Sequence, residues 1–358
     1  MKPFALLLTC TLVSTSVVAH ADFTYEESTQ ITGGSVVSMM KFAGAFSKQA
    51  RQANEPILTG VMVKGNRMIR TTKDSSEVID LDAGTIMEIN HVKRQYTIVT
   101  FEQMRKQMEA AVAKAKAEQP KQQQQTPNND AQNVEMKFNI KVRNTGATKD
   151  VAGLSAKESI MTMTVDAKDQ KSGQTGSLAV TTDMYLVPEI PGYEEVQEFD
   201  KRYAMKMGTV MSEAINPQMM AMMQQPSAGK GMADMQVEMS KLKGTPVLQI
   251  MRMGTTLDGT PLPAASEAPL PTGPPPPTAG EIAKQSASAA IMSSIPFGGF
   301  GRKKKQEDPP PAANSTPQNS AVLIEMSTQM TNFSKGSVDS NQFNPPAGYK
   351  QVEARQLD

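Results

Sequence analysis

The chain has 358 residues, with 37 Lys and Arg against 36 Asp and Glu, one Cys and two His. This near-neutral balance argues against a general nucleic-acid-binding protein, which usually carries a basic excess. So few Cys and His residues also leave little for a Cys–His or Ser–His nucleophile, or for a zinc site of the usual kind. Pro, Gln and Ser tracts occupy much of the length, so we expect one core with long insertions.

The first 21 residues have the pattern of a secretory signal peptide, with Lys2, an apolar run and the A-x-A site Ala19-His20-Ala21. A competing interpretation, lipid attachment at Cys10, leaves too short a charged and apolar region before the cysteine. We expect cleavage after Ala21 and a periplasmic or secreted mature protein. No transmembrane segment is expected, because the apolar run is shorter than the ~20 residues that a bilayer needs.

Two elements are predicted before the main sheet. Residues 23–32 read as a strand that ends at Gly33-Gly34. The apolar residues between 36 and 51 then recur at spacings of three and four, which predicts an amphipathic helix.

The stretch from Ile57 to Phe101 contains five short runs rich in Val, Ile, Thr, Met or Tyr, separated by turn residues. Each run is too short for a typical helix, and the pattern predicts an antiparallel meander around which the chain is organised. The predicted strands are 59–64, 67–71, 77–81, 85–90 and 95–100.

Two helices and three further strands follow. Thr100 and Gln103 have the spacing of a capping box, which predicts a helix starting at Phe101. Strands are expected at 134–143, 156–167 and 176–187. After Pro191-Gly192 comes the most regular amphipathic pattern of the chain, whose apolar face is Val196, Phe199, Tyr203, Met207 and Val210.

Two more strand-like segments, Thr245 to Met253 and Val322 to Thr331, are separated by a Pro-rich tract. A long loop costs only about 0.6 kcal/mol for each doubling of its length, so the two segments can pair as a split hairpin. We therefore expect a single α+β domain at 22–358, with disordered insertions at 119–133 and 257–320.

Three stretches of the chain carry a resemblance: Gly60 to Arg70, Asn144 to Gly153 and Phe343 to Lys350. Together they resemble an uncharacterised family of secreted bacterial proteins, known as a domain of unknown function and similar in fold to the LolA and LolB lipoprotein carriers. The resemblance implies an antiparallel half-barrel whose concave side is covered by helices and can hold an acyl chain. Ala156 stands where many members carry a cysteine, and Leu154 where an aromatic residue is common.

Other features admit several interpretations. His91, the only histidine of the mature chain, falls in a tight turn and is expected to be solvated.

Ten methionines lie between Met205 and Met239. They fit ordinary helix packing, an adaptable surface for lipid or a partner, or soft ligands for Cu(I). The basic run 302–305 fits either a solvated loop or contact with an anionic membrane surface.

The leading hypothesis is an exported, non-enzymatic protein whose curled sheet and helices enclose an apolar groove for a lipid or a lipidated partner, as the resemblance implies. No cofactor or metal site is expected. The first alternative is an envelope interaction or scaffold protein that binds a partner through its Pro-rich insertion, and the second is a hydrolase. The candidate groove residues are large apolar side chains on elements expected to face each other: Met40, Phe46, Met62, Met87, Tyr96 and Met207.

Overall fold

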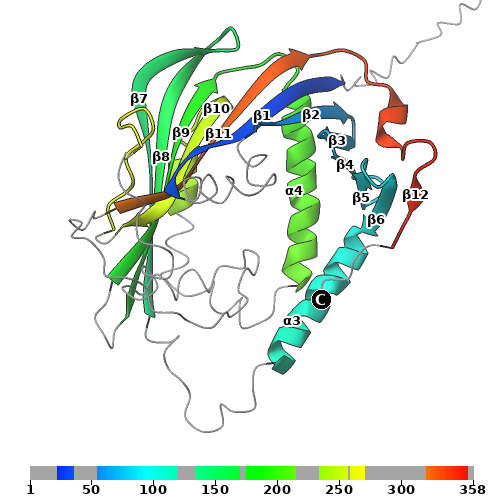
Figure 1. Cartoon of the computed structure of the whole chain (residues 1–358), viewed down its shortest axis with the longest axis horizontal. Helices are drawn as coiled ribbons and strands as arrows, with labels where there is room; N and C mark the ends of the chain where they lie inside the picture. Colours follow the sequence, from blue (N-terminus) through cyan, green and yellow to red (C-terminus); the bar gives the residue numbers. More distant parts are fainter. Residues whose placement is uncertain are drawn as a thin grey trace, which may run out of the picture.

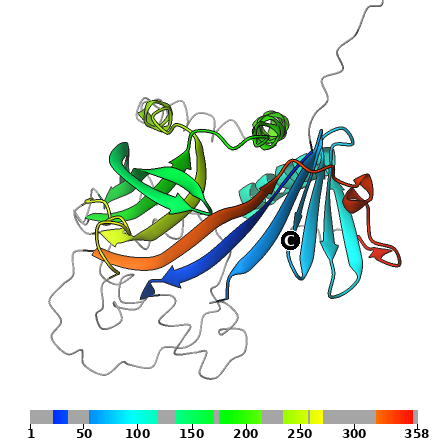
Figure 2. The ribbon, with the colours of Figure 1, turned by 90° about the horizontal axis from the view of Figure 1, so that it is seen from above.

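The computed structural model describes residues 22–35, 55–118, 134–169, 175–214, 234–256, 259–270 and 320–353. Within them, 12 strands form one sheet in the order β12-β6-β5-β4-β3-β2-β1-β11-β10-β9-β8-β7. All neighbouring strands are antiparallel except β12 and β6. The order has two ends, so the sheet is open, and Figures 1 and 2 show it strongly bent. The predicted class, α+β with a curled antiparallel sheet, is confirmed at this level.

One half of the sheet is the predicted meander, which is confirmed strand by strand. Its turns use glycine where the backbone enters the left-handed region, as at Gly65 (φ 58°) and Gly84 (φ 63°). The N-terminal strand pairs with the meander, as expected for neighbouring segments. The elements are β1 (Phe23–Gly33), β2 (Ile57–Lys64), β3 (Arg67–Thr71), β4 (Ser75–Asp80), β5 (Thr85–Asn90) and β6 (Gln95–Thr100).

The other half consists of longer strands. Met251 in β10 lies opposite Met326 in β11, so the split hairpin is confirmed. Strand β11 also pairs with β1 and thereby joins the two halves. The elements are β7 (Val134–Val151), β8 (Leu154–Asp169), β9 (Thr175–Val187), β10 (Thr245–Thr256) and β11 (Ser320–Ser334).

Helices α3 (Phe101–Glu118) and α4 (Glu194–Ala214) lie near each other beside the sheet (Figure 1). The predicted capping box begins α3, because the Thr100 N–H donates to Gln103 Oε1 at 2.8 Å and the Gln103 N–H donates to Thr100 Oγ1 at 3.0 Å. The apolar face of α4 is also confirmed, and Phe199 is completely buried. The Tyr203 ring lies against the rings of both Phe199 and Phe101, which ties α4 to the start of α3.

The main core brings opposite faces of the sheet together. Tyr25 in β1 lies opposite Val61 in β2, so their side chains share one face of the sheet. Leu248 in β10 lies opposite Gln329 in β11, which lies opposite Ser28 in β1. Ser28 is three residues after Tyr25, so by alternation Leu248 is on the other face. Tyr25, Val61 and Leu248 nevertheless share one core cluster with α4. Five strand-to-strand steps separate β2 from β8, and the usual twist of 20–25° for each step turns the sheet by roughly 100°. This twist allows α4 to contact both halves.

The C-terminal residues cover the second face of the meander. Val338 and Phe343, the latter in the 3₁₀ helix η3 (Ser340–Phe343), pack on Ile69 and Val78. Strand β12 (Lys350–Gln351) then pairs with β6 at the edge of the sheet. Strands β3, β4 and β5 therefore have buried side chains on both faces, whereas β6 at the edge has none.

The expectation that 257–320 is a disordered insertion is wrong for its first part. Residues 259–270, here called the docked segment, pack on β9, β10 and β11, with Leu262 2% exposed and Ala264 fully buried. Thr181 Oγ1 donates to the Leu262 carbonyl at 2.8 Å. The composition did not predict this docking, because the segment is held mainly through its backbone.

Buried charges fix the docked segment to the sheet. Asp183, which is fully buried, accepts hydrogen bonds from the N–H groups of Ala265 and Ser266 at 3.2 and 2.7 Å. Arg252 donates to the carbonyls of Pro263 and Ala264 and forms a 2.7 Å ion pair with Glu325. Desolvation raises the pKa of the neighbouring Glu158, but hydrogen bonds from Thr145, Ser266 and Tyr185 outweigh it and bring that pKa below its usual range.

Several sequence-based predictions fall outside the described residues. These are the signal peptide at 1–21, the helix at 36–51, the insertion at 119–133, the methionines from 219 to 223, the remainder of the Pro-rich tract at 271–319 and the basic run at 302–305. The structure does not test them.

Glu325→Gln should lower the free energy of unfolding by about 3–5 kcal/mol, because it leaves the buried Arg252 guanidinium without its carboxylate. The matched control is Glu198→Gln, which breaks an exposed ion pair with Lys201 and should cost less than about 1 kcal/mol. Urea unfolding measures both. Equal effects would contradict the assigned role of the Arg252–Glu325 pair.

Candidate functional site

The predicted groove residues do not share one surface. Met62, Met87 and Tyr96 belong to the cluster that the C-terminal residues cover, whereas Met207 on α4 packs against the main core on the helix side. Met40 and Phe46 lie outside the described residues. Side chains alternate along a strand, so Met62 points away from its neighbours Val61 and Val63, which face the helices. The sequence does not reveal which face the helices cover.

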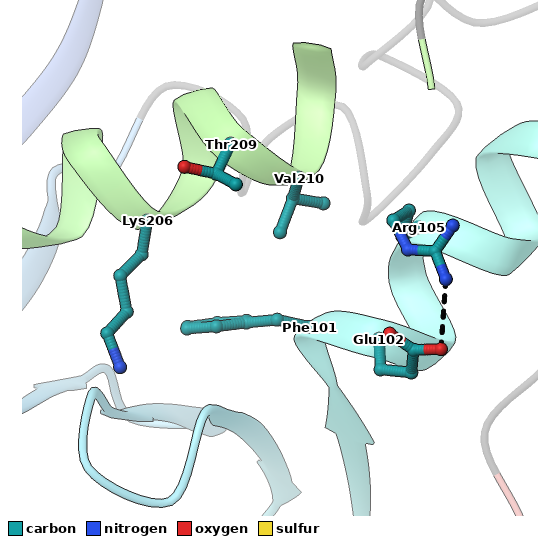
Figure 3. A pocket seen from close by; sticks show the side chains of 6 residues that line it. All are labelled: Phe101, Glu102, Arg105, Lys206, Thr209 and Val210. Carbon is teal, nitrogen blue, oxygen red and sulfur yellow. Dashed lines mark hydrogen bonds and ion pairs between the residues drawn. The ribbon is translucent and has the colours of Figure 1, made fainter. Parts of the chain in front are cut away.

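A pocket of about 290 Å³ lies instead between α3 and α4 (Figure 3). Phe101 and Val210 form its apolar part, and the Phe101 ring extends from the start of α3 toward α4. The remaining lining side chains are polar or charged and come from both helices: Glu102, Arg105, Lys206 and Thr209. The pocket thus combines an apolar floor with a charged rim.

Ion pairs order the α3 side of this rim. Arg105 donates to Glu102 at 2.9 Å and to Glu109 at 2.6 Å. The hydrogen bond from Arg105 holds the pKa of Glu102 below its usual range, and the same bond raises the pKa of Arg105. On the α4 side, Lys206 Nζ donates to the carbonyl of Leu81. That contact uses one of the three ammonium hydrogens and holds the positive charge beside the floor.

A second pocket, of about 470 Å³, lies between β7, β8 and residues 238–241. Its charged lining is largely paired. Glu238 forms ion pairs with Lys241 and accepts a 2.7 Å hydrogen bond from the Val142 N–H, while Arg143 pairs with Glu267 of the docked segment. Because these charged groups already bind each other and join separate segments of the chain, the second pocket is a weaker candidate for ligand binding than the pocket between the helices.

One face of the β8–β11 half carries a surface rich in methionine. Its central row crosses the sheet from Val142 through Met161, Thr182, Met251 and Met326 to Ile31. The next row is Ile140, Met163, Val180, Met253 and Ile324, and the row on the other side contains Ser159, Met184, Gln249, Thr328 and Thr29. None of these residues is charged. We call these three rows the methionine face.

The opposite face of the same strands holds the charges. Asp183, Arg252 and Glu325 lie between these rows along β9, β10 and β11, so their side chains point to the opposite face. All three are buried and bind the docked segment or each other. Alternation along the strands therefore separates a polar face that holds part of the chain from a face with thioether and aliphatic side chains.

His91 lies in the predicted turn, but it is half-buried and hydrogen-bonded instead of solvated. Its Nε2 lies 2.7 Å from Ser76 Oγ and its Nδ1 3.2 Å from the Tyr349 hydroxyl. Ser76 Oγ also donates to Thr71 Oγ1 at 3.0 Å. His91 joins the meander to the C-terminal segment.

The sequence predicted a helix that starts at Phe101 and an apolar helix face that contains Val210, but not that the two helices meet around a pocket. For the methionine face a signal was present. The pairs Met161/Met163 and Met251/Met253 have one residue between them, which puts both members of a pair on one face of a strand. Only the register shows that the two pairs lie on the same face.

No protein-family model matches the chain, and comparison with curated proteins finds no match. In the described part of the chain, no helix is long and apolar enough to cross a membrane. Nor do three or more His, Cys, Asp or Glu side chains come together there in a way that could hold a metal ion.

His91→Ala should lower the free energy of unfolding by about 1–2 kcal/mol, because two side-chain hydrogen bonds are lost at a half-buried position. Tyr349→Phe removes only the contact with Nδ1 and should cost less. Thermal or urea unfolding of the two variants distinguishes them. A neutral His91→Ala substitution would contradict the bridging role.

Proposed function

We propose that this protein is an exported, non-enzymatic carrier that holds a lipid or a lipidated partner, with an acyl chain in the pocket between α3 and α4. The proposal includes a fold similar to the LolA and LolB carriers and a mature protein that acts in the periplasm or outside the cell. It requires no cofactor and no bond-making step. The ligand class comes from the chemistry of the pocket together with the resemblance in the sequence.

The observation that carries the proposal is an apolar floor beside a charged rim that includes the Lys206 ammonium. Phe101 is 8% exposed and Val210 half-buried, so the floor is fixed by packing. Lys206 and Arg105 stand at the rim on different helices. A volume near 290 Å³ is close to the lower end of the range for small-molecule sites, which suits one slender chain.

An amphiphile fits this arrangement in one orientation. Its methylene groups would lie on Phe101 and Val210, where removing apolar surface from water is favourable by about 25 cal/mol per Å². Its anionic end would lie near the Lys206 ammonium, which has two hydrogens beyond the contact with Leu81. The Glu102 carboxylate is already paired with Arg105 and repels an anion less than a free carboxylate would.

The docked segment weakens the alternative of a scaffold protein. Residues 259–270 belong to the Pro-rich insertion, yet they are held against the sheet by buried groups. This part of the insertion is therefore not presented as an extended ligand for a partner. The carrier proposal is favoured because it uses a pocket that the described residues form.

The test is uptake of a fluorescent fatty acid by the mature protein, combined with native mass spectrometry of protein purified from its own compartment. Val210→Glu should weaken uptake by about tenfold or more, because it places a carboxylate at the apolar floor. The matched control is Val92→Glu, at a turn residue that is 73% exposed, which should leave uptake unchanged. The proposal fails if no lipid co-purifies and no fatty acid is taken up, or if both variants behave alike.

A further inference from the structure

The methionine face contains four neighbouring methionines on β9, β10 and β11: Met184, Met251, Met253 and Met326. Met251 and Met326 are directly opposite each other on β10 and β11. Met253 follows Met251 on the same face, and Met184 on β9 pairs with Gln249, which places it diagonally across from Met251. Met251, Met253 and Met326 thus lie close together on the same face of two adjacent strands, with Met184 farther away on the next strand.

The spacing of these positions suits a shared ligand. Directly opposite residues in an antiparallel pair have Cβ atoms about 4.5–5.5 Å apart, and diagonal neighbours are about 7–8 Å apart. Residues two apart on a strand are separated by about 7 Å. A methionine sulfur lies two bonds beyond Cβ, and the two flexible torsions χ1 and χ2 set its position. The sulfurs of Met251, Met253 and Met326 can therefore converge without a change in the backbone.

From this placement we propose that Met251, Met253 and Met326 bind a soft monovalent cation of the Cu(I) class through their three thioether sulfurs. Thioethers are soft ligands that favour Cu(I) over hard cations. The site differs from the methionines between 205 and 239 that drew attention in the sequence. It also does not depend on the proposed carrier function, because none of its residues lines the pocket between the helices.

The residues around these methionines favour an ion with a single positive charge over a divalent ion. The three rows of the methionine face contain no carboxylate, imidazole or thiol, so the thioethers are its only soft ligands. A neutral set of ligands in an apolar setting leaves the full ionic charge uncompensated, which disfavours a divalent ion much more than a monovalent one. Met251, Met253 and Met326 are half-buried and Met184 is buried, so the site is shielded yet reachable.

The direct test is NMR of the full mature protein with ¹³C-labelled methionine methyl groups, titrated with Ag(I) as a stable monovalent soft cation. We expect the methyl signals of Met251, Met253 and Met326 to shift and to saturate at about one equivalent. The signals of Met68, Met87 and Met207, which lie in other clusters, should not move. Shifts confined to methionines between 205 and 239, or no saturable shift, would overturn the assignment.

Competition with a coloured Cu(I) chelator under anaerobic conditions gives the affinity. The triple variant Met251→Leu/Met253→Leu/Met326→Leu should bind Cu(I) at least about 100-fold more weakly, since even the loss of groups that only support metal ligands can cost 10–100-fold. Met→Leu nearly conserves volume, so the variant should keep its fold. The control variant, Met68→Leu/Met87→Leu/Met207→Leu, should retain wild-type affinity. Equal affinity in the two triple variants would refute the site.

Discussion

The packing of α4 against two opposite faces of one sheet is the constraint on which the rest of the structure depends. Phe199 and Val196 lie in a cluster with Tyr25 and Val61 from one face and with Leu248 from the other. The usual twist of a long sheet between β2 and β8, together with the register shifts beside Tyr25 and Leu248, allows this packing. The same helix, once fixed, holds Lys206 and Val210 beside the start of α3, so the pocket between the helices follows from the twist of the sheet.

Alternation along the strands gives the two faces of the β8–β11 half different chemistry. The charged face binds part of the chain itself: Asp183 accepts from two backbone N–H groups of the docked segment, and Arg252 donates to two of its carbonyls. Such buried charges are tolerated because each has partners. The methionine face has no charge to satisfy. Its thioethers are the ligands of the cation site that we propose, and this site is separate from the pocket proposed for an acyl chain.

Local patterns predicted much of the fold. The meander, the capping box at Thr100 and Gln103 and the split hairpin depend on nearby residues or on simple complementarity of two strands, and all three are confirmed. The sites were harder to predict because they depend on tertiary placement. Met62 and Met207 are both large and apolar, yet they lie in different clusters. The docked segment was missed because its composition resembles a linker, while its partners are charged side chains on distant strands.

The measurement that tests this account most directly is a nuclear Overhauser experiment on protein with labelled methyl groups and aromatic rings. The Val196 methyls and the Phe199 ring should show contacts to side chains of β1–β3, such as Tyr25 or Val61, and also to side chains of β8–β10, such as Val187 or Leu248. Contacts to both groups in one folded species are the predicted result. Contacts to only one half of the sheet would contradict the central role of the twist and of α4.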